Sequence, residues 1–245
     1  MKAVVTAGGR IDGAFAAAAG TRVKALAPVR GSTMLQRVID ALRSAGAERV
    51  AVVGGDEVRA ACGTEVERFV DESPSGSENM LRALRAWPDD GEPLLYATSD
   101  LPYVTGEAIR EFAAGVAPEA LAVALAEHSD FTRRFPGGPP SFGITLAGER
   151  VVNGGVFRIP DGGADKLAAI ATRFFDARKR PWRMASLVSP LVFIRFLCKR
   201  LSIGDLEGLA SRVLEMPARA IRRCAPELAY DIDTAVEYEY ARARA

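Results

Sequence analysis

Histidine is nearly absent from this sequence, and its scarcity excludes most chemistry that depends on imidazole. The 245 residues include one histidine, His128. Zinc sites built from several histidines therefore have no ligands here. A Ser-His-Asp triad or a Cys-His pair would have to use His128, which closes the apolar run 121–126 beside the polar residues Glu127 and Ser129. Any bound metal is expected to take oxygen ligands, which is typical of Mg²⁺.

Cysteines and long apolar runs are also scarce. The three cysteines, Cys62, Cys198 and Cys224, form no CxxC pair. This spacing indicates neither a disulfide framework nor a zinc site, so we expect a protein of the reducing cytoplasm. The apolar stretch 187–198 is interrupted by a proline and an arginine. It is shorter than the roughly 20 residues that a membrane span needs, so no span is predicted.

Neither sign of charge is in excess. The chain has 32 lysines and arginines against 31 aspartates and glutamates, a net charge of +1. No end of the chain is strongly basic, so nucleic acid is not an expected partner. With 49% hydrophobic and 26% charged residues, the composition is that of a globular protein.

In the first half of the chain, short apolar runs alternate with helical patterns. The apolar runs lie at 3–6, 50–53, 94–97 and 121–125. They are bounded by glycine, proline or charged residues and predict buried, mostly parallel strands. Helices are predicted from Met34 to Gly46, over 78–86 and over 106–114, the first with a capping box of Thr33 and Gln36. This alternation predicts an α/β fold, a mostly parallel open sheet flanked by helices in a Rossmann-like three-layer arrangement.

The second half begins with a loop, 134–140, that is rich in proline and glycine. After it, 142–146 and 151–159 alternate as a strand pair on an extension of the sheet would. Further helices are predicted over 164–178 and 185–201. No segment is long and polar enough to separate two domains, so we expect one domain over 1–245.

The first candidate site residues follow the first strand. Ala7-Gly8-Gly9-Arg10 comes directly after it, and glycines there let backbone N–H groups approach an anion closely. A plain tight turn is the alternative explanation. Neither a P-loop nor a Gly-x-Gly-x-x-Gly fingerprint follows any predicted strand. Lys24 lies further along, before the turn that leads into the first predicted helix.

Aspartates occur at two places suited to a metal or a phosphate. Asp100 ends the third predicted strand, at the carboxyl edge of the sheet, where open α/β folds bind ligands. Asp231 and Asp233 flank Ile232 in an extended segment, so they share one face. Asp100 also fits a turn or helix cap, and Asp233 or Thr234 fits an N-cap of a helix over 235–243.

Taken in order, these motifs resemble those of the MobA-like nucleotidyltransferases, the superfamily of molybdenum-cofactor guanylyltransferases and cytidylyltransferases and of sugar-phosphate pyrophosphorylases. The shared motifs are Ala-Gly-Gly, the lysine, the Met-Leu helix start, Asp-Leu-Pro, Asn-Gly-Gly and Asp-x-Asp-Thr, and they span nearly the whole chain. The sequence departs from the family between the glycines and Lys24. There the usual Ser-x-Arg-Met-Gly is replaced by a longer, alanine-rich segment, 11–23.

The resemblance implies a nucleotide-diphospho-sugar transferase-like fold and a reaction. The expected reaction is the Mg²⁺-dependent transfer of an NMP unit from an NTP to a phosphorylated small molecule, molybdopterin-like or a sugar 1-phosphate, with release of pyrophosphate. Residues 1–125 would bind the nucleotide and 126–245 the acceptor. The implied residues are Lys24, Asp100 and Asp233 for catalysis; Asp100 and Asp233 for the metal; Ala7, Gly8, Gly9, Arg10, Lys24, Gly76, Ser77 and Asn79 for the nucleotide; and Asn153, Gly154, Arg178 and Lys179 for the acceptor.

The looser matches have simpler explanations as well. The loop 73–80 also fits a helix N-cap, Asn153 a β-turn, and the basic run at 178–183 a solvated helix end. Apolar residues at 192, 193 and 196 fit either a buried core or the contact of a homodimer.

Two other functions explain parts of the pattern. A glycosyltransferase that uses a nucleotide sugar would explain Asp231-Ile232-Asp233 as a DxD pair, although such enzymes carry that pair mid-chain. A catalytically inactive nucleotide-binding protein would explain the altered segment 11–23.

Overall fold

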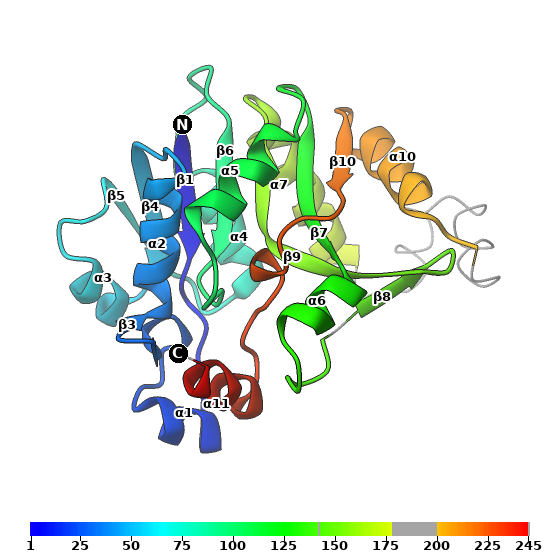
Figure 1. The fold of residues 1–245 in the computed structure, drawn as a ribbon. Helices are drawn as coiled ribbons and strands as arrows, with labels where there is room; N and C mark the ends of the chain where they lie inside the picture. The colour runs from blue at the N-terminus through cyan, green and yellow to red at the C-terminus, as the bar shows by residue number, and fades with distance from the viewer. Residues whose placement is uncertain (142, 178–199, 245) are drawn as a thin grey trace.

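The computed structural model describes residues 1–141, 143–177 and 200–244 (Figure 1). The main sheet consists of β1 (Lys2–Thr6), β4 (Arg49–Gly54), β5 (Arg68–Asp71), β6 (Leu94–Thr98), β7 (Leu121–Glu127), β8 (Gly143–Leu146), β9 (Glu149–Ile159) and β10 (Ala218–Ile221). A small hairpin is formed by β2 (Pro28–Val29) and β3 (Ser32–Thr33). The helices are α1 (Gly13–Ala19), α2 (Met34–Ser44), α3 (Asp56–Cys62), α4 (Gly76–Leu84), α5 (Gly106–Ala114), α6 (His128–Arg134), α7 (Gly163–Ala177), α10 (Ile203–Leu214) and α11 (Ala235–Ala243), with 3-10 turns η1 (Lys24–Leu26) and η2 (Pro226–Leu228).

The sheet is mostly parallel, as the sequence predicts. Its strand order is β10-β7-β9-β6-β1-β4-β5, with β8 paired to β9. The pairs β6-β1, β1-β4, β4-β5 and β10-β7 are parallel. The expected α/β fold is therefore confirmed in these residues.

Both faces of the central strands are buried. In β1, Ala3, Val4 and Val5 have no exposed surface. Val5 packs in a cluster with side chains of α2 and α5, and Val4 packs in a second cluster with side chains of α4 and α7. Figure 1 shows these helix pairs on opposite faces of the sheet. Continuous apolar strands of this kind are expected wherever helices cover a parallel sheet on both sides.

The position of β9 differs from the predicted sheet extension. β8 and β9 do pair, but β9 runs antiparallel between β6 and β7, in the body of the sheet. Two glycines allow this close approach. A Cβ on Gly154 would lie 3.0 Å from the carbonyl oxygens of Ala124 and Leu228, and one on Gly155 would lie 2.5 Å from Thr98 Oγ1. Alternation in the sequence shows a strand but not its neighbours, so it did not reveal this placement.

Most predicted helices are present, with shifted ends. Helix α5 has the predicted bounds, whereas α4 begins at Gly76, two residues before the predicted start. The Thr33 hydroxyl caps α2 by accepting the N–H of Gln36 at 3.1 Å, but the Gln36 amide donates to Asp40 instead of closing a capping box.

The predicted helix 185–201 falls mostly outside the described residues. The described residues 200 and 201 are not helical, and α10 begins at Ile203. None of the helices in the described ranges is both long and apolar enough to span a bilayer.

Helices α1 and α11 meet at the end of the sheet where β1 stops (Figure 1). The rings of Phe15 and Tyr238 lie 5.1 Å apart between them, and the Tyr238 hydroxyl donates to the carbonyl of Pro28 at 2.9 Å. The beginning and end of the chain are thus joined through one apolar cluster.

Candidate functional site

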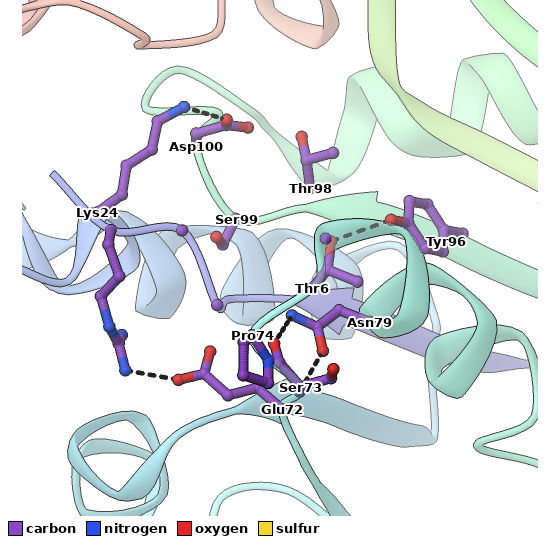
Figure 2. Close-up of a pocket in the computed structure, with 14 residues that line it drawn as sticks. Thr6, Lys24, Glu72, Ser73, Pro74, Asn79, Tyr96, Thr98, Ser99 and Asp100 are labelled. Atoms are coloured by element: carbon purple, nitrogen blue, oxygen red, sulfur yellow. Dashed lines mark hydrogen bonds and ion pairs between the residues drawn. The ribbon is translucent and has the colours of Figure 1, made fainter. Parts of the chain in front are cut away.

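A cavity of about 670 Å³ opens at the carboxyl ends of β1 and β6 (Figure 2). Six of the eight residues predicted to bind nucleotide line it: Gly8, Gly9, Arg10, Lys24, Gly76 and Asn79. The predicted metal ligand Asp100 lines it too. Ser73 and Pro74, from the loop 73–80 that the sequence matched more loosely, line it as well. The remaining lining residues, which were not among the predicted site residues, are Thr6, Glu72, Tyr96, Thr98 and Ser99.

The alanine-rich segment 11–23 leaves this cavity and returns to it. Residues 13–19 form α1, and Arg10 and Val23 then pair as an antiparallel bridge. The N–H of Lys24 donates to the carbonyl of Gly9 at 2.9 Å. The longer segment therefore forms a helix outside the cavity, and Lys24 is placed directly beside the glycines.

Lys24 joins two carboxylates that are distant in the sequence. Its Nζ donates to Asp100 Oδ2 at 2.6 Å and to Asp233 Oδ1 at 2.5 Å. The side chains of Lys24 and Asp100 are 13% and 18% exposed, whereas that of Asp233 is 69% exposed. Burial alone would lower the pKa of Lys24, but the two carboxylates outweigh it and raise the pKa above the usual lysine value. Lys24 is therefore held in its charged form.

The carboxylates at this point are not fully neutralised. Asp100 Oδ1 is buried and has no hydrogen-bond partner in the described part of the chain. Desolvation, followed by the charges of Asp100 and Asp233, raises the pKa of Asp231 to about 6. A buried carboxylate oxygen without a partner is costly, so this position favours a cation or donor supplied by a ligand.

Glu72 is the main lining residue that the sequence analysis missed. Its Oε1 accepts from Arg10 at 2.5 Å, while its Oε2 is buried without a hydrogen-bond partner among the described residues. It follows β5 directly, and its N–H donates to the carbonyl of Gly54 at 2.9 Å. A carboxylate at the end of a predicted strand would have been the signal, but the apolar pattern of β5 is too short to predict that strand.

The sequence matches the MobA-like NTP transferase domain family over residues 3–228. The chain belongs to this family. The resemblance of the motifs is thereby confirmed, and with it the assignment as a nucleotidyltransferase. None of the curated proteins matches this sequence significantly.

Solved structures agree with the family. A hypothetical transferase from Thermus thermophilus is 28% identical with a TM-score of 0.82, and the match covers 97% of this chain and 100% of that one. The Rv0371c protein of Mycobacterium tuberculosis, in complex with manganese, is 19% identical with a TM-score of 0.57, covering 100% and 98%. A CMP:2-keto-3-deoxy-manno-octonic acid synthetase complexed with CTP is 14% identical with a TM-score of 0.57, also covering 100% and 98%. The last two share the fold with this MobA-like chain.

Two residues predicted to bind the nucleotide, Ala7 and Ser77, do not line the cavity. Ala7 is buried and its N–H donates to the carbonyl of Val53 at 2.8 Å, so that N–H is already used. Ser77 does not line the cavity, and its hydroxyl lies 2.8 Å from that of Ser75. Arg178 and Lys179 lie outside the described residues.

The predicted acceptor residues of β9 are also away from the cavity of the MobA-like site. Asn153 lines a separate, largely apolar cavity, and its amide donates to the carbonyl of Gly154. Gly154 is packed against β7 and η2, which leaves no room for a ligand on that side. The single histidine, His128, lines yet another cavity with Arg150 and Arg222.

Asp233 is held beside Lys24 by the start of α11. Glu237 Oε2 accepts the N–H groups of Asp233 and Thr234, each at 2.7 Å, and the Thr234 hydroxyl accepts the N–H of Glu237 at 3.3 Å. Of the two cap candidates, Asp233 and Thr234, the N-cap of the helix is thus Thr234. Capping and the contact of Asp233 with Lys24 occur together.

Removing the Glu237 side chain should loosen Asp233. For Glu237→Ala we expect a loss of about 1 kcal/mol in the free energy of unfolding, the usual worth of such a cap. We also expect about fivefold weaker binding of NTP with Mg²⁺, measured by calorimetry. Glu239→Ala, an exposed glutamate on the same helix, is the matched control. Equal affinities for the two variants would show that the cap does not position Asp233.

The glycine loop gives a second test. A Cβ on Gly8 would lie 2.3 Å from Glu72 Oε2 and 3.0 Å from Asn79 Nδ2. Because the Glu72 carboxylate ends a flexible side chain, Gly8→Ala should fold but displace that carboxylate, and NTP affinity should fall about tenfold or more. Gly208→Ala lies on α10, outside the lining of this cavity, and meets no atom within 4 Å, so it should bind NTP as the wild type does. Titration of both variants with NTP shows whether the loss of affinity comes from displacement of Glu72 or from any glycine-to-alanine change.

Proposed function

We propose that this chain is an Mg²⁺-dependent nucleotidyltransferase that joins an NMP unit to a phosphorylated small molecule and releases pyrophosphate. The observation that carries the proposal is the meeting of Lys24, Asp100 and Asp233 at one end of the cavity, beside the Gly8-Gly9 loop. These groups come from four separate segments of the chain, and each is of a type that binds triphosphate or metal.

The cavity suits an NTP in size and lining. Its volume of about 670 Å³ falls within the usual range for small-molecule sites. Gly8 and Gly9 have no side chains to block access to their backbone, and backbone N–H groups bind phosphate oxygens well. The octonic acid synthetase, which shares the fold and is complexed with CTP, supports a nucleotide as the ligand. We place the triphosphate at Lys24 and the base toward Glu72 and Asn79.

The residues present fit a divalent metal. Asp100 offers a buried oxygen without a hydrogen-bond partner in the described part of the chain, and Asp233 lies within reach of the same lysine. Groups of three or more His, Cys, Asp or Glu residues suited to a metal do not occur among the described residues. Mg²⁺ commonly uses only one or two carboxylates and takes its other ligands from water and substrate phosphates. The manganese complex of the Mycobacterium tuberculosis neighbour supports a divalent ion.

The chain's own groups provide charge and positioning. In the proposed step, an acceptor oxygen bonds to the α-phosphorus of the NTP, and the bond from that phosphorus to the bridging oxygen breaks as pyrophosphate leaves. Lys24 stays protonated and would stabilise negative charge on the phosphates. A bound metal would add further positive charge beside those phosphates. An acceptor phosphate is already ionised, so the step needs no histidine as a base.

We place the acceptor on the far side of Asp233. A cavity of about 440 Å³ is lined there by Ser141, Tyr230, Asp231, Asp233 and Glu237, with two prolines, so the uncharged part of the acceptor, and not its phosphate, would face these carboxylates. The Ser141 hydroxyl is buried and has no hydrogen-bond partner among the described residues. This arrangement supports the expected division, in which residues 1–125 bind the nucleotide and 126–245 bind the acceptor.

The cellular location is proposed from the cysteines. Cys62 and Cys224 are free, and burial followed by the charge of Glu65 raises the pKa of Cys62 to about 11. An unreactive buried thiol agrees with a reducing compartment, and we propose the cytoplasm.

The decisive experiment is titration of the protein with ATP, GTP, CTP and UTP by calorimetry, with Mg²⁺ and with EDTA. We expect one NTP to bind best and only with the metal. That NTP is then incubated with molybdopterin and with sugar 1-phosphates, and pyrophosphate release is measured. A nucleotide sugar bound more tightly than every NTP would favour a glycosyltransferase. Binding of an NTP without pyrophosphate release for any acceptor would favour an inactive nucleotide-binding protein.

A further inference from the structure

A second polar cavity lies apart from the nucleotide cavity. It has a volume of about 390 Å³ and is lined by Arg30, Tyr103, Arg134, Phe135 and Arg244. These residues come from the β2-β3 hairpin, the loop after β6, the end of α6 and the end of α11. None of them lines the nucleotide cavity or the cavity beside Asp233. We call it the arginine cavity.

The arginine cavity has an excess of positive charge. Of its three guanidinium groups, that of Arg134 is paired with Glu227, at 2.5 Å. Arg244 donates to the carbonyl of Pro136 at 2.7 Å and lies 4.7 Å from the ring centre of Tyr240. Within residues 1–141, 143–177 and 200–244, neither Arg30 nor Arg244 pairs with a carboxylate. Guanidinium groups without a carboxylate partner in the described chain favour an anionic ligand.

Tyr103 adds a donor to the same cavity. The residue is 7% exposed, and its hydroxyl is buried without a hydrogen-bond partner in the part of the chain described. Burial and Tyr240 raise the pKa of Tyr103, whereas the charges of the three arginines lower it. All three guanidinium groups are therefore close enough to affect the Tyr103 hydroxyl electrostatically. A buried hydroxyl without a hydrogen-bond partner destabilises the fold. An anion in the cavity would accept a hydrogen bond from it.

The hairpin holds Arg30 in an unusual conformation. Arg30 has a φ of 57°, in the left-handed region that residues with side chains rarely adopt, and Gly31 follows with a φ of 82°. Arg37 holds this turn by donating to the carbonyls of Val29 and Arg30, each at 2.8 Å. Strained residues that are held in this way are often found at ligand sites.

We propose that the arginine cavity binds a small anion, with its phosphate or carboxylate group held by Arg30, Arg134, Arg244 and the Tyr103 hydroxyl. Three guanidinium groups and one hydroxyl match the acceptor oxygens of such a group. This anion would bind apart from the nucleotide, because the arginine cavity shares no lining residue with the nucleotide cavity.

The arginine cavity lies behind both acidic segments of the nucleotide site. Tyr103 follows Asp100 closely in the chain, and its ring meets that of Tyr230 edge-on, with centres 5.1 Å apart. Tyr230 in turn directly precedes Asp231. An anion bound to Tyr103 would therefore contact the loop that carries Asp100 and, through Tyr230, the segment that carries Asp233.

The test is calorimetric titration with inorganic phosphate and with citrate at low ionic strength, without nucleotide. The double variant Arg30→Ala/Arg244→Ala should bind the preferred anion at least about tenfold more weakly than the wild type. A control double variant, Arg133→Ala/Arg212→Ala, removes the same charge outside the cavity and should bind as the wild type does. Lys24→Ala should also keep this binding, because Lys24 lies in the other cavity.

Tyr103→Phe separates ligand binding from folding. Because the hydroxyl has no partner in the described chain, its removal should leave Tm unchanged or raise it, yet weaken anion binding about fivefold. Phosphate and citrate that bind the wild type and Arg30→Ala/Arg244→Ala equally would overturn the proposal. Loss of binding in Lys24→Ala alone would overturn it as well, since the anion would then occupy the nucleotide cavity.

Discussion

Asp100→Asn should abolish Mg²⁺-dependent binding of NTP and slow pyrophosphate release at least about 1,000-fold, which corresponds to about 4 kcal/mol of lost transition-state stabilisation. The reason lies in Asp100 Oδ1, which is buried and without a hydrogen-bond partner in the described residues. The asparagine has the same size but no charge for the metal. Calorimetry with and without Mg²⁺ and a pyrophosphate assay measure the two effects.

The control for this variant is Asp40→Asn. Asp40 is an exposed residue on α2 that accepts a hydrogen bond from Gln36, and an asparagine can still accept it. This control should bind nucleotide and turn over as the wild type does. Unchanged Mg²⁺ dependence in Asp100→Asn would remove Asp100 from the metal site.

Lys24→Ala should slow turnover by about 100-fold to 1,000-fold, the usual effect of removing one charged group that stabilises a transition state. It should also bring Asp100 and Asp233 together without the cation that now lies between them. Repulsion between the carboxylates should lower Tm in EDTA, and added Mg²⁺ should raise Tm more than it does in the wild type. Turnover and thermal unfolding are measured with and without the metal.

Lys166→Ala provides the comparison for that lysine. Lys166 lies on α7, where its Nζ donates to the carbonyl of Glu215 at 3.2 Å on the surface. Its loss should change neither turnover nor the response to Mg²⁺. A Lys24→Ala variant as active as Lys166→Ala would rule out a role for Lys24 in phosphate stabilisation.

The parts of the fold that follow from local pattern were predictable. The apolar runs that became β1, β4 and β6 are buried on both faces for most of their length, so their composition alone indicated a covered parallel sheet. The place of β9 in that sheet was not predictable. It depends on close contacts of Gly154 and Gly155 with other strands, and such contacts leave no periodic signal in one sequence.

The candidate site, too, could be predicted from the sequence only where local motifs mark its residues. Gly8, Lys24 and Asp100 belong to motifs whose order could be read, and the structure brings them to one cavity. Glu72 belongs to no such motif and reaches the cavity through the pairing of β5 with β4. Asn153 matched a motif yet lines a different cavity, with residues of β7 and α10, because the local pattern does not show which elements lie beside its strand.

The contact between Lys24 and Asp233 joins residues 209 positions apart in the chain. On a ribosome that adds about 5–20 residues per second, Asp233 is synthesised roughly 10 to 40 s after Lys24. Contacts between such distant positions also form late and slowly during refolding. A nascent chain can therefore complete its sheet, but its reaction centre closes only when α11 docks onto α1. Recovery of nucleotide binding should thus be among the last events of folding.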